Sequence, residues 1–234
     1  MSGPVALDDS EWPATRPDRV LRIMDVLLAL MGALLMAPAM LVIASLVLIT
    51  LGRPVLFVQR RTGRGTASFD LIKFRSMTDA KDKSGQLLSD ELRTTRLGRI
   101  LRRTRLDELP ELWNVLKGDM SLIGPRPLLP QTIQNMGVEG LWRCSVRPGL
   151  TGWAQICGNS TLTDRQKLSL DLWYIRHRSL SQDMLIFVRT IQLVLQGERI
   201  DDERLEAAMH RPETPMRDTI SRERSRDNST EQAD

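Results

Sequence analysis

A run of 27 residues without a charged side chain, from Val26 to Gly52, constrains this sequence more than any other feature. A bilayer core is about 30 Å thick, and a helix of about 20 apolar residues crosses it. The run is longer than the ~7–15-residue apolar core of a cleaved signal peptide, and no convincing cleavage site follows it. The sequence therefore predicts a membrane helix over residues 19–52.

Pro38 lies near the middle of this run and predicts a kink, because proline removes a backbone hydrogen bond and its ring clashes with the preceding turn. At ~1.5 Å per residue the two arms reach ~18 and ~20 Å, so neither crosses a bilayer alone. Arginines flank both ends, which favours two cytoplasmic ends. A re-entrant helix and a single kinked span both remain open, since membrane helices tolerate proline.

The remaining sequence is expected to form one domain of the α+β class, mostly helical, over residues 53–200. Alternating patterns predict strands at 54–58 and 67–77, joined by a basic turn as a small β-hairpin. Apolar spacing predicts helices at 95–103, 106–117, 166–175 and 184–195, and the last is apolar enough for the core or a membrane surface. Residues 1–18 and 212–234 are expected to be mobile or disordered tails.

The charge balance favours an anionic partner. Lysine and arginine number 33 against 29 aspartate and glutamate, which suits phosphate, nucleic acid or lipid headgroups. Aromatic residues make up only 4% of the chain, so few stacking platforms exist and no nucleic-acid partner is expected. The two cysteines and two histidines match neither a disulfide framework nor a zinc site.

The segment LDELPELWNVLKGDMSLIGPRP, residues 106–127, places Asp107 and Glu108 between arginines. Locally, Asp107 reads as a helix cap, and the mixed charges also suit a surface ion-pair network. A third interpretation is chemical. Arginine forks and a helix N-terminus would hold phosphate oxygens, while the carboxylates would hold Mg²⁺ and attack phosphorus.

Further cationic side chains could face the same anion. Lys73 and Arg75 alternate around Phe74 in a predicted strand, which places both on one side of it. Arg126 lies in a Gly-Pro-Arg-Pro loop, and Arg147 precedes a Pro-Gly pair. Proline fixes the backbone at both positions, as a ligand clamp requires.

Three motifs occur in order behind the proline-containing apolar run: KFRSM at 73–77, the acidic segment at 106–127, and RPGLTGWAQ at 147–155. Together they resemble the bacterial sugar transferases, the small monotopic polyprenyl-phosphate phosphoglycosyltransferases, over residues 19–199. The resemblance implies transfer of a sugar 1-phosphate from a UDP-sugar to undecaprenyl phosphate with release of UMP. It also implies the cytoplasmic face of the bacterial inner membrane and a re-entrant helix broken at Pro38.

By this resemblance, Asp107 matches the nucleophile that forms a phosphosugar intermediate and contacts Mg²⁺, and Glu108 matches its partner carboxylate. Arg102 and Arg126 match phosphate-binding positions. Glu111 is a departure, because many members carry glutamine there, and Ala37 stands where another member has serine. Neither departure is expected to affect the chemistry.

A membrane-anchored scaffold without catalytic activity, binding anionic lipid or a partner enzyme, is the alternative function. It predicts no metal-dependent UMP release. A homodimer is also considered, although no motif bears on it. The sequence does not indicate which UDP-sugar is used or which glycan is assembled.

Overall fold

The structure is a computed structural model that describes residues 18–196. The predicted tails lie outside the described residues, apart from Asp18, which begins the first helix. The described residues are mostly helical and carry two two-stranded sheets, which confirms the predicted mixture of elements. The α-helices are α1 Asp18–Leu51, α2 Asp90–Arg93, α3 Arg96–Thr104, α4 Glu111–Lys117, α5 Pro130–Asn135, α6 Gly137–Arg143, α7 Trp153–Ile156, α8 Asp164–His177 and α9 Leu180–Gln196. The strands and 3₁₀ turns are β1 Leu56–Thr62, η2 Arg64–Thr66, β2 Ser68–Phe74, η3 Leu106–Glu108, β3 Ser121–Ile123, β4 Gly149–Thr151 and η4 Asn159–Thr161.

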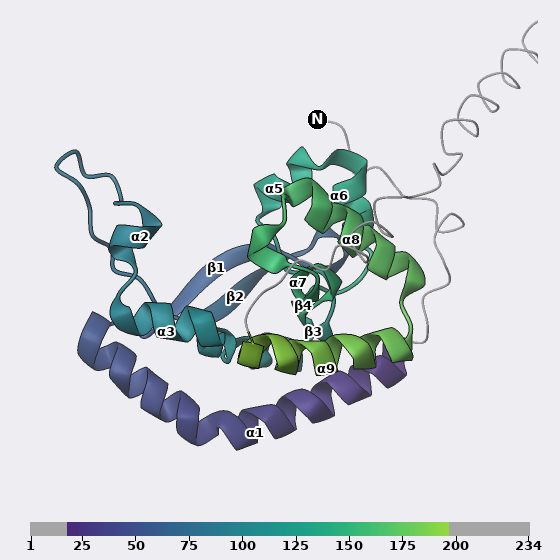
Figure 1. Cartoon of the computed structure of the whole chain (residues 1–234), viewed down its shortest axis with the longest axis horizontal. Coiled ribbons are helices and arrows are strands. Elements are labelled where there is room, and N and C mark those ends of the chain that lie inside the picture. Colours follow the sequence, from purple (N-terminus) through teal and green to yellow (C-terminus); the bar gives the residue numbers. More distant parts are fainter. Residues whose placement is uncertain (1–17, 197–234) are drawn as a thin grey trace, which may run out of the picture.

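Helix α1 runs unbroken through Pro38 and is bent near its middle (Figure 1). The predicted kink is therefore a bend within a continuous helix. From Arg19 to Leu51 the helix is long and apolar enough to cross a membrane. Most of its large apolar side chains are exposed, including Leu34, Leu35 and Ile49. A surface of this kind suits lipid contact, whereas a water-soluble helix buries its apolar face.

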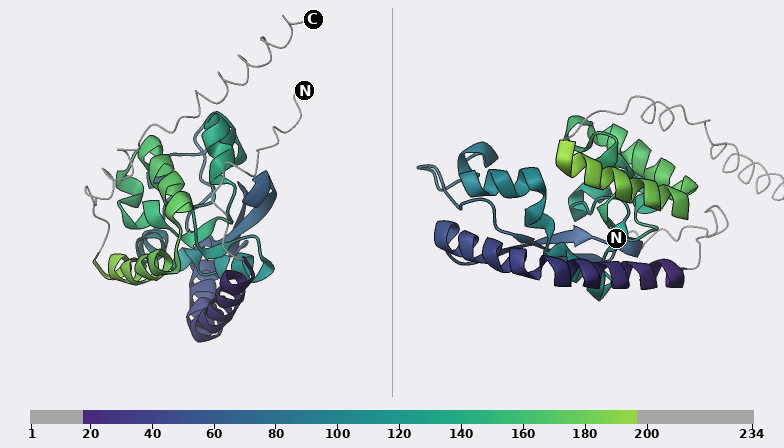
Figure 2. Two further views of the ribbon diagram at one scale, coloured as in Figure 1. Left: turned by 90° about the vertical axis from the view of Figure 1, so that its right-hand side faces the viewer. Right: turned by 60° about the horizontal axis from the view of Figure 1, so that its bottom comes forward.

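Polar contacts fasten α1 to the rest of the molecule near its start. Arg22 donates to the carbonyls of Val115 and Leu116, at 2.6 and 2.9 Å. The carboxylate of Asp25 accepts from the Ser121 hydroxyl at 2.8 Å and from the Leu122 amide at 3.0 Å. The apolar helix and the polar domain are therefore joined by hydrogen bonds as well as by packing, and they lie side by side in both orientations of Figure 2.

Strands β1 and β2 form an antiparallel hairpin in which Leu56 pairs with Phe74 and Thr62 with Ser68. The first strand was predicted too early and too short, since it begins two residues later and continues through the basic segment that was predicted as a turn. The reversal itself is made by η2. Side chains directly opposite in an antiparallel pair share one face. Gln59 and Arg61 therefore lie on the face that carries Lys73.

The predicted helix over 106–117 is two elements. After α3 the backbone of Arg105 adopts a left-handed conformation, φ 56°, and the chain makes the 3₁₀ turn η3 before α4 begins at Glu111. Pro110 has no amide hydrogen to donate to Leu106, so the turn is closed by shorter i→i−3 bonds instead. The acidic pair consequently sits in a tight turn between two helices.

Three buried apolar clusters hold these elements together. Ala29 of α1, Leu71 of β2 and Val115 of α4 belong to one cluster, which lies beneath the hairpin. A second joins the end of α1 to α3, and a third joins α7, α8 and α9. Ile100 belongs to the apolar spacing that predicted helix α3, but its side chain is exposed. Helix α9 buries Ile186 but exposes several apolar neighbours, so the core interpretation holds for only one of its faces.

Candidate active site

Asp107 and Glu108 are each only 8% exposed, in the turn between α3 and α4. Neither η3 nor α4 has a side-chain cap, so the interpretation of Asp107 as a helix cap is wrong. The burial of both carboxyl groups also excludes the surface ion-pair network. Buried carboxyl groups need specific partners to remain charged.

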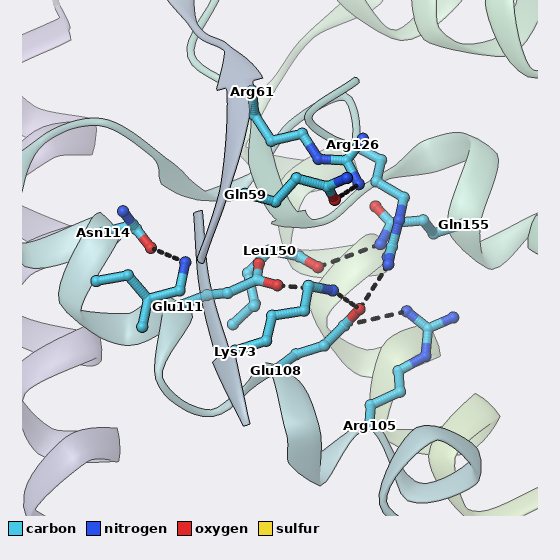
Figure 3. A network of polar contacts seen from close by, with 11 residues as sticks. Gln59, Arg61, Lys73, Arg105, Glu108, Glu111, Asn114, Arg126, Leu150 and Gln155 are labelled. Atoms are coloured by element: carbon cyan, nitrogen blue, oxygen red, sulfur yellow. Dashed lines mark hydrogen bonds and ion pairs between the residues drawn. The ribbon is translucent and has the colours of Figure 1, made fainter. Parts of the chain in front are cut away.

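Glu108 has such partners (Figure 3). Its Oε1 atom lies 2.7 Å from Lys73 Nζ and 2.6 Å from Arg126 Nη2, and its Oε2 atom lies 4.0 Å from Arg105 Nη1. Burial alone would raise the pKa of Glu108, but Arg126, Lys73 and Arg105 overcome this and lower the pKa to about 2. Glu108 is therefore a carboxylate at neutral pH, held in place by three cations.

Asp107 is shifted in the opposite direction. Burial and the neighbouring Glu108 raise its pKa, while Lys73 and Arg102 act against this rise. No ion pair within the described part of the chain involves its carboxyl group. A carboxylate that is poorly solvated and more basic is a stronger nucleophile. Adjacent acids with opposite shifts suit different roles, Asp107 reacting and Glu108 ordering the surrounding cations.

Glu111 belongs to the same cluster, contrary to the expectation that this position lies outside the chemistry. Its Oε1 atom is 2.9 Å from Lys73 Nζ, and the residue is only 3% exposed. Burial, together with Glu108, raises the pKa of Glu111 to about 7, against the pull of Lys73. One lysine therefore bridges two buried carboxyl groups, of which Glu108 is ionised and Glu111 titrates near neutrality.

Between pH 5 and pH 8, the free energy of unfolding of the variant Glu111→Gln is expected to rise by about 1–3 kcal/mol relative to that of the parent. A group whose pKa rises from 4.5 to about 7 on folding binds more protons in the folded state. Its contribution to stability therefore falls as pH rises through that window. Glutamine does not titrate and keeps an oxygen for Lys73.

Thermal unfolding of both proteins at pH 5, 6, 7 and 8 measures this difference. Glu108, with its pKa lowered to about 2, stays ionised throughout this range and adds no slope. Parallel pH profiles for parent and variant would contradict the prediction.

The other predicted arginines lie at different places. Arg102 is exposed on α3, close enough to Asp107 to oppose the rise in its pKa, and its Nη1 atom lies 3.7 Å from the sulfur of Met77. Arg75 lies near the end of α1, where it donates to the carbonyls of Leu51 and Arg53. The phosphate-binding role of Arg102 stays a prediction, while the contacts of Arg75 are those of a side chain that joins α1 to the domain.

Arg147 is also engaged elsewhere. Its Nε atom donates to the carbonyl of Gly118 at 3.2 Å, at the C-terminal end of α4. A cation there complements the helix dipole. The nearby loop is packed closely, since a Cβ atom on Gly124 would lie 2.5 Å from the Arg147 carbonyl oxygen. Arg147 thus supports the segment before the Arg126 loop, and its role in ligand binding stays a prediction.

The backbone of the loop that carries Arg126 is supported by a buried ion pair. Arg143 of α6 donates through Nη2 to the carbonyl oxygen of Arg126 at 2.5 Å, and through Nε to Asp171 Oδ2 of α8 at 2.8 Å. Both Arg143 and Asp171 are buried. This pair fixes the backbone from which Arg126 reaches Glu108.

Sequence reasoning missed Arg61 and Gln155. Arg61 Nη2 donates to Gln59 Oε1 at 2.6 Å, and its side chain lies next to Arg126 in Figure 3. Gln155 of α7 is drawn close to Arg126 in Figure 3, and its Nε2 atom donates to the carbonyl of Leu150 at 3.2 Å. Continuing the first strand past 58 would have revealed Arg61, because period-two alternation across the hairpin places it on the face of Lys73.

An exposed apolar helix beside buried carboxyl groups and several arginines is typical of an enzyme that acts on an anionic substrate at a membrane. The chain belongs to the bacterial sugar transferase family, whose model matches residues 17–197, and it is therefore a transferase.

Individual relatives agree with this assignment. The uncharacterized sugar transferase EpsL of Bacillus subtilis is 45% identical over 67% of this chain and 77% of its own length. A UDP-glucose:undecaprenyl-phosphate glucose-1-phosphate transferase of Caulobacter vibrioides is 39% identical over 78% of this chain and 72% of its own. A UDP-N-acetylgalactosamine-undecaprenyl-phosphate N-acetylgalactosaminephosphotransferase of Aeromonas hydrophila is 42% identical over 74% of this chain, but the match spans only 43% of that longer protein.

Proposed function

We propose that this chain transfers a sugar 1-phosphate from a UDP-sugar to undecaprenyl phosphate and releases UMP, the first membrane step in assembling a lipid-linked glycan. The observation that carries the proposal is the buried pair Asp107 and Glu108, whose pKa values shift in opposite directions beside Lys73 and Arg126. The names of the Caulobacter and Aeromonas relatives support the same reaction.

The chemistry proceeds in two displacements. The Asp107 carboxylate attacks the phosphorus that bears the sugar, a bond from its oxygen to phosphorus forms, and the bond to the UMP oxygen breaks. UMP leaves with that electron pair. A phosphate oxygen of undecaprenyl phosphate then attacks the same phosphorus, and the bond to Asp107 breaks. The carboxylate is regenerated and the lipid carries a diphosphate-linked sugar.

The surrounding residues prepare this reaction in distinct ways. Arg126 keeps 39% of its side-chain surface exposed, so it can contact phosphate oxygens while it holds Glu108. Lys73 and Arg102 stabilise the ionised form of Asp107 before attack. Charge then develops on the phosphoryl oxygens, where fixed cations contribute most to catalysis.

Mg²⁺ is proposed as the cofactor. Among the described residues no three acidic, histidine or cysteine side chains gather into a metal cluster. This ion is commonly bound by one or two carboxylates together with substrate phosphates, so the donor set fits it with Asp107 as the protein ligand. The oxygens of Glu108 already face Lys73, Arg126 and Arg105. When bound, the ion would neutralise charge on the diphosphate.

A panel of UDP-sugars, incubated with the full-length protein, undecaprenyl phosphate and Mg²⁺, tests the proposed function. UMP release from at least one UDP-sugar is expected, together with a lipid product that contains the sugar. Absence of UMP release with every sugar, from protein that is folded and membrane-bound, would favour the scaffold alternative. The same panel identifies the sugar.

The placement of α1 is part of the proposal: a re-entrant helix in the inner membrane, bent around Pro38, with the domain on the cytoplasmic face. Two variants, Arg19→Cys and Arg53→Cys, each add one cysteine at an end of the helix. Both native cysteines are buried, so background labelling is low. An impermeant maleimide is expected to label both variants in inside-out vesicles and neither in right-side-out vesicles. Labelling from opposite sides would instead establish a span.

A further inference from the structure

Figure 3 draws the side chain of Arg61 beside that of Arg126 in the candidate active site, and the charge of Arg126 acts on Arg61. Burial, together with the positive charge of Arg126, lowers the pKa of Arg61, while Glu111 raises it. Like charges repel, so an arrangement of this kind is costly unless an anion lies between them. Arg126 forms an ion pair with Glu108, whereas Arg61 forms no ion pair with a carboxylate in the described part of the chain.

The donors of Arg61 are only partly used. A guanidinium carries five N–H donors. One nitrogen, Nη2, bonds Gln59 Oε1 at 2.6 Å, and this bond orients the side chain from within its own strand. The Nε atom is buried and has no hydrogen-bond partner in the described structure. A planar fork with a free donor beside a second arginine is suited to phosphate oxygens.

The balance of charges in the cluster also favours a bound anion. Its cationic side chains are Arg61, Lys73, Arg105 and Arg126, and its carboxyl groups are Asp107, Glu108 and Glu111. Four cations therefore face three carboxyl groups, so positive charge is in excess even when all three carboxyl groups are ionised. A diphosphate would supply the missing negative charge.

Gln155 indicates which phosphate-bearing substrate fits. The residue is only 3% exposed, and its Oε1 atom is buried without a hydrogen-bond partner in the described residues. An ionised phosphate offers acceptors alone and cannot satisfy this oxygen. A hydroxyl or N–H group can. A nucleotide sugar carries such groups on either side of its diphosphate, whereas the lipid phosphate carries a hydrocarbon chain.

We propose that Arg61 and Arg126 together clasp the diphosphate of the nucleotide sugar, and that Gln155 Oε1 accepts a hydrogen bond from a hydroxyl or N–H group next to that diphosphate. The inference rests on the proposed function for the identity of the substrate. It adds Arg61 and Gln155, neither of which was named as a site residue from the sequence, as residues that bind the sugar donor rather than the lipid acceptor.

Arg61→Gln, Arg61→Lys and Gln155→Met test the clasp in the full-length protein. Arg61→Gln is expected to raise the KM for the UDP-sugar at least about tenfold, with Arg61→Lys intermediate and the KM for undecaprenyl phosphate within twofold of the parent. Gln155→Met is expected to raise the KM for the UDP-sugar severalfold. Arg60→Gln is the matched control, because Arg60 is exposed on the opposite face of the same strand.

Calorimetric binding of UDP and of inorganic pyrophosphate gives a second readout that needs no turnover. Arg61→Gln is expected to weaken both ligands, whereas Gln155→Met weakens UDP or the UDP-sugar and leaves pyrophosphate unchanged. If Arg61→Gln raises only the KM for undecaprenyl phosphate, Arg61 belongs to the lipid site and the proposal is overturned. Unchanged kinetics and binding, with unchanged thermal unfolding, would also overturn it.

The two proposals can fail separately. A parent protein that binds UDP through Arg61 but releases no UMP would contradict the proposed reaction and leave the clasp intact. If the parent releases UMP and the Arg61→Gln variant has the same kinetics and binding, the proposed reaction stands and the clasp is contradicted.

Discussion

Asp107→Asn is expected to reduce UMP release by about 10³-fold or more, because the amide oxygen that replaces the carboxylate cannot form a stable phosphoryl ester. The substitution keeps the size of the side chain, so the turn around η3 should be preserved. It also removes a buried acid whose pKa is raised by burial, so the variant is expected to fold. The measurement is UMP release under saturating substrates, with thermal unfolding as a check on the fold.

Two companion variants separate chemistry from structure. Glu108→Gln is expected to lose most turnover, since Lys73 and Arg126 lose the charge that orders them, yet it retains the Asp107 nucleophile. A phosphosugar adduct on Asp107 should therefore remain detectable by mass spectrometry in that variant. Asp90→Asn, on the exposed surface of α2, should behave as the parent. Full UMP release by Asp107→Asn would rule out the nucleophile assignment.

The sequence predicted the parts of the fold that depend on local pattern. The uncharged run gave α1, and Thr95 marked the start of α3, where its side chain accepts from the Gly98 amide. Local pattern failed in the acidic segment, although the proline that interrupts it lies within the segment itself. The acidic segment was read as one helix with Asp107 as its cap, although Pro110 divides that stretch and no cap is made.

The composition of the candidate site was predictable only in part. Asp107, Glu108, Lys73 and Arg126 were named from motifs, and the structure brings them together. Glu111 entered the cluster through Lys73, a contact between residues on different elements that no spacing rule reveals. Arg61 was hidden by a strand boundary placed too early.

Arg143 illustrates the same limit, because its partner Asp171 lies 28 residues away on another helix. Neither residue belongs to a recognisable motif, yet the pair supports the backbone of Arg126. Positioning residues of this kind are visible only in the folded chain. Their importance for activity is therefore a question for substitution experiments.

Arg143→Met is expected to lower the free energy of unfolding by about 3–5 kcal/mol, because it leaves the buried carboxyl group of Asp171 without its cation. Burial already raises the pKa of Asp171 despite Arg143, and losing the arginine should raise it further. A raised carboxyl pKa means that stability falls as pH rises through the interval between the unfolded and folded values. The variant should therefore be less destabilised at pH 5 than at pH 8.

The double variant Arg143→Met/Asp171→Leu separates stability from positioning. Replacing both members of a buried ion pair with apolar residues is often neutral or stabilising, so its unfolding free energy should recover toward that of the parent. The hydrogen bond from Arg143 to the Arg126 carbonyl stays lost, so kcat should remain about tenfold or more below the parent value. Chemical denaturation and UMP release measured on the same preparations decide the matter. Recovery of activity together with stability would show that Arg143 serves the fold alone, whereas stability without activity assigns it to the placement of Arg126.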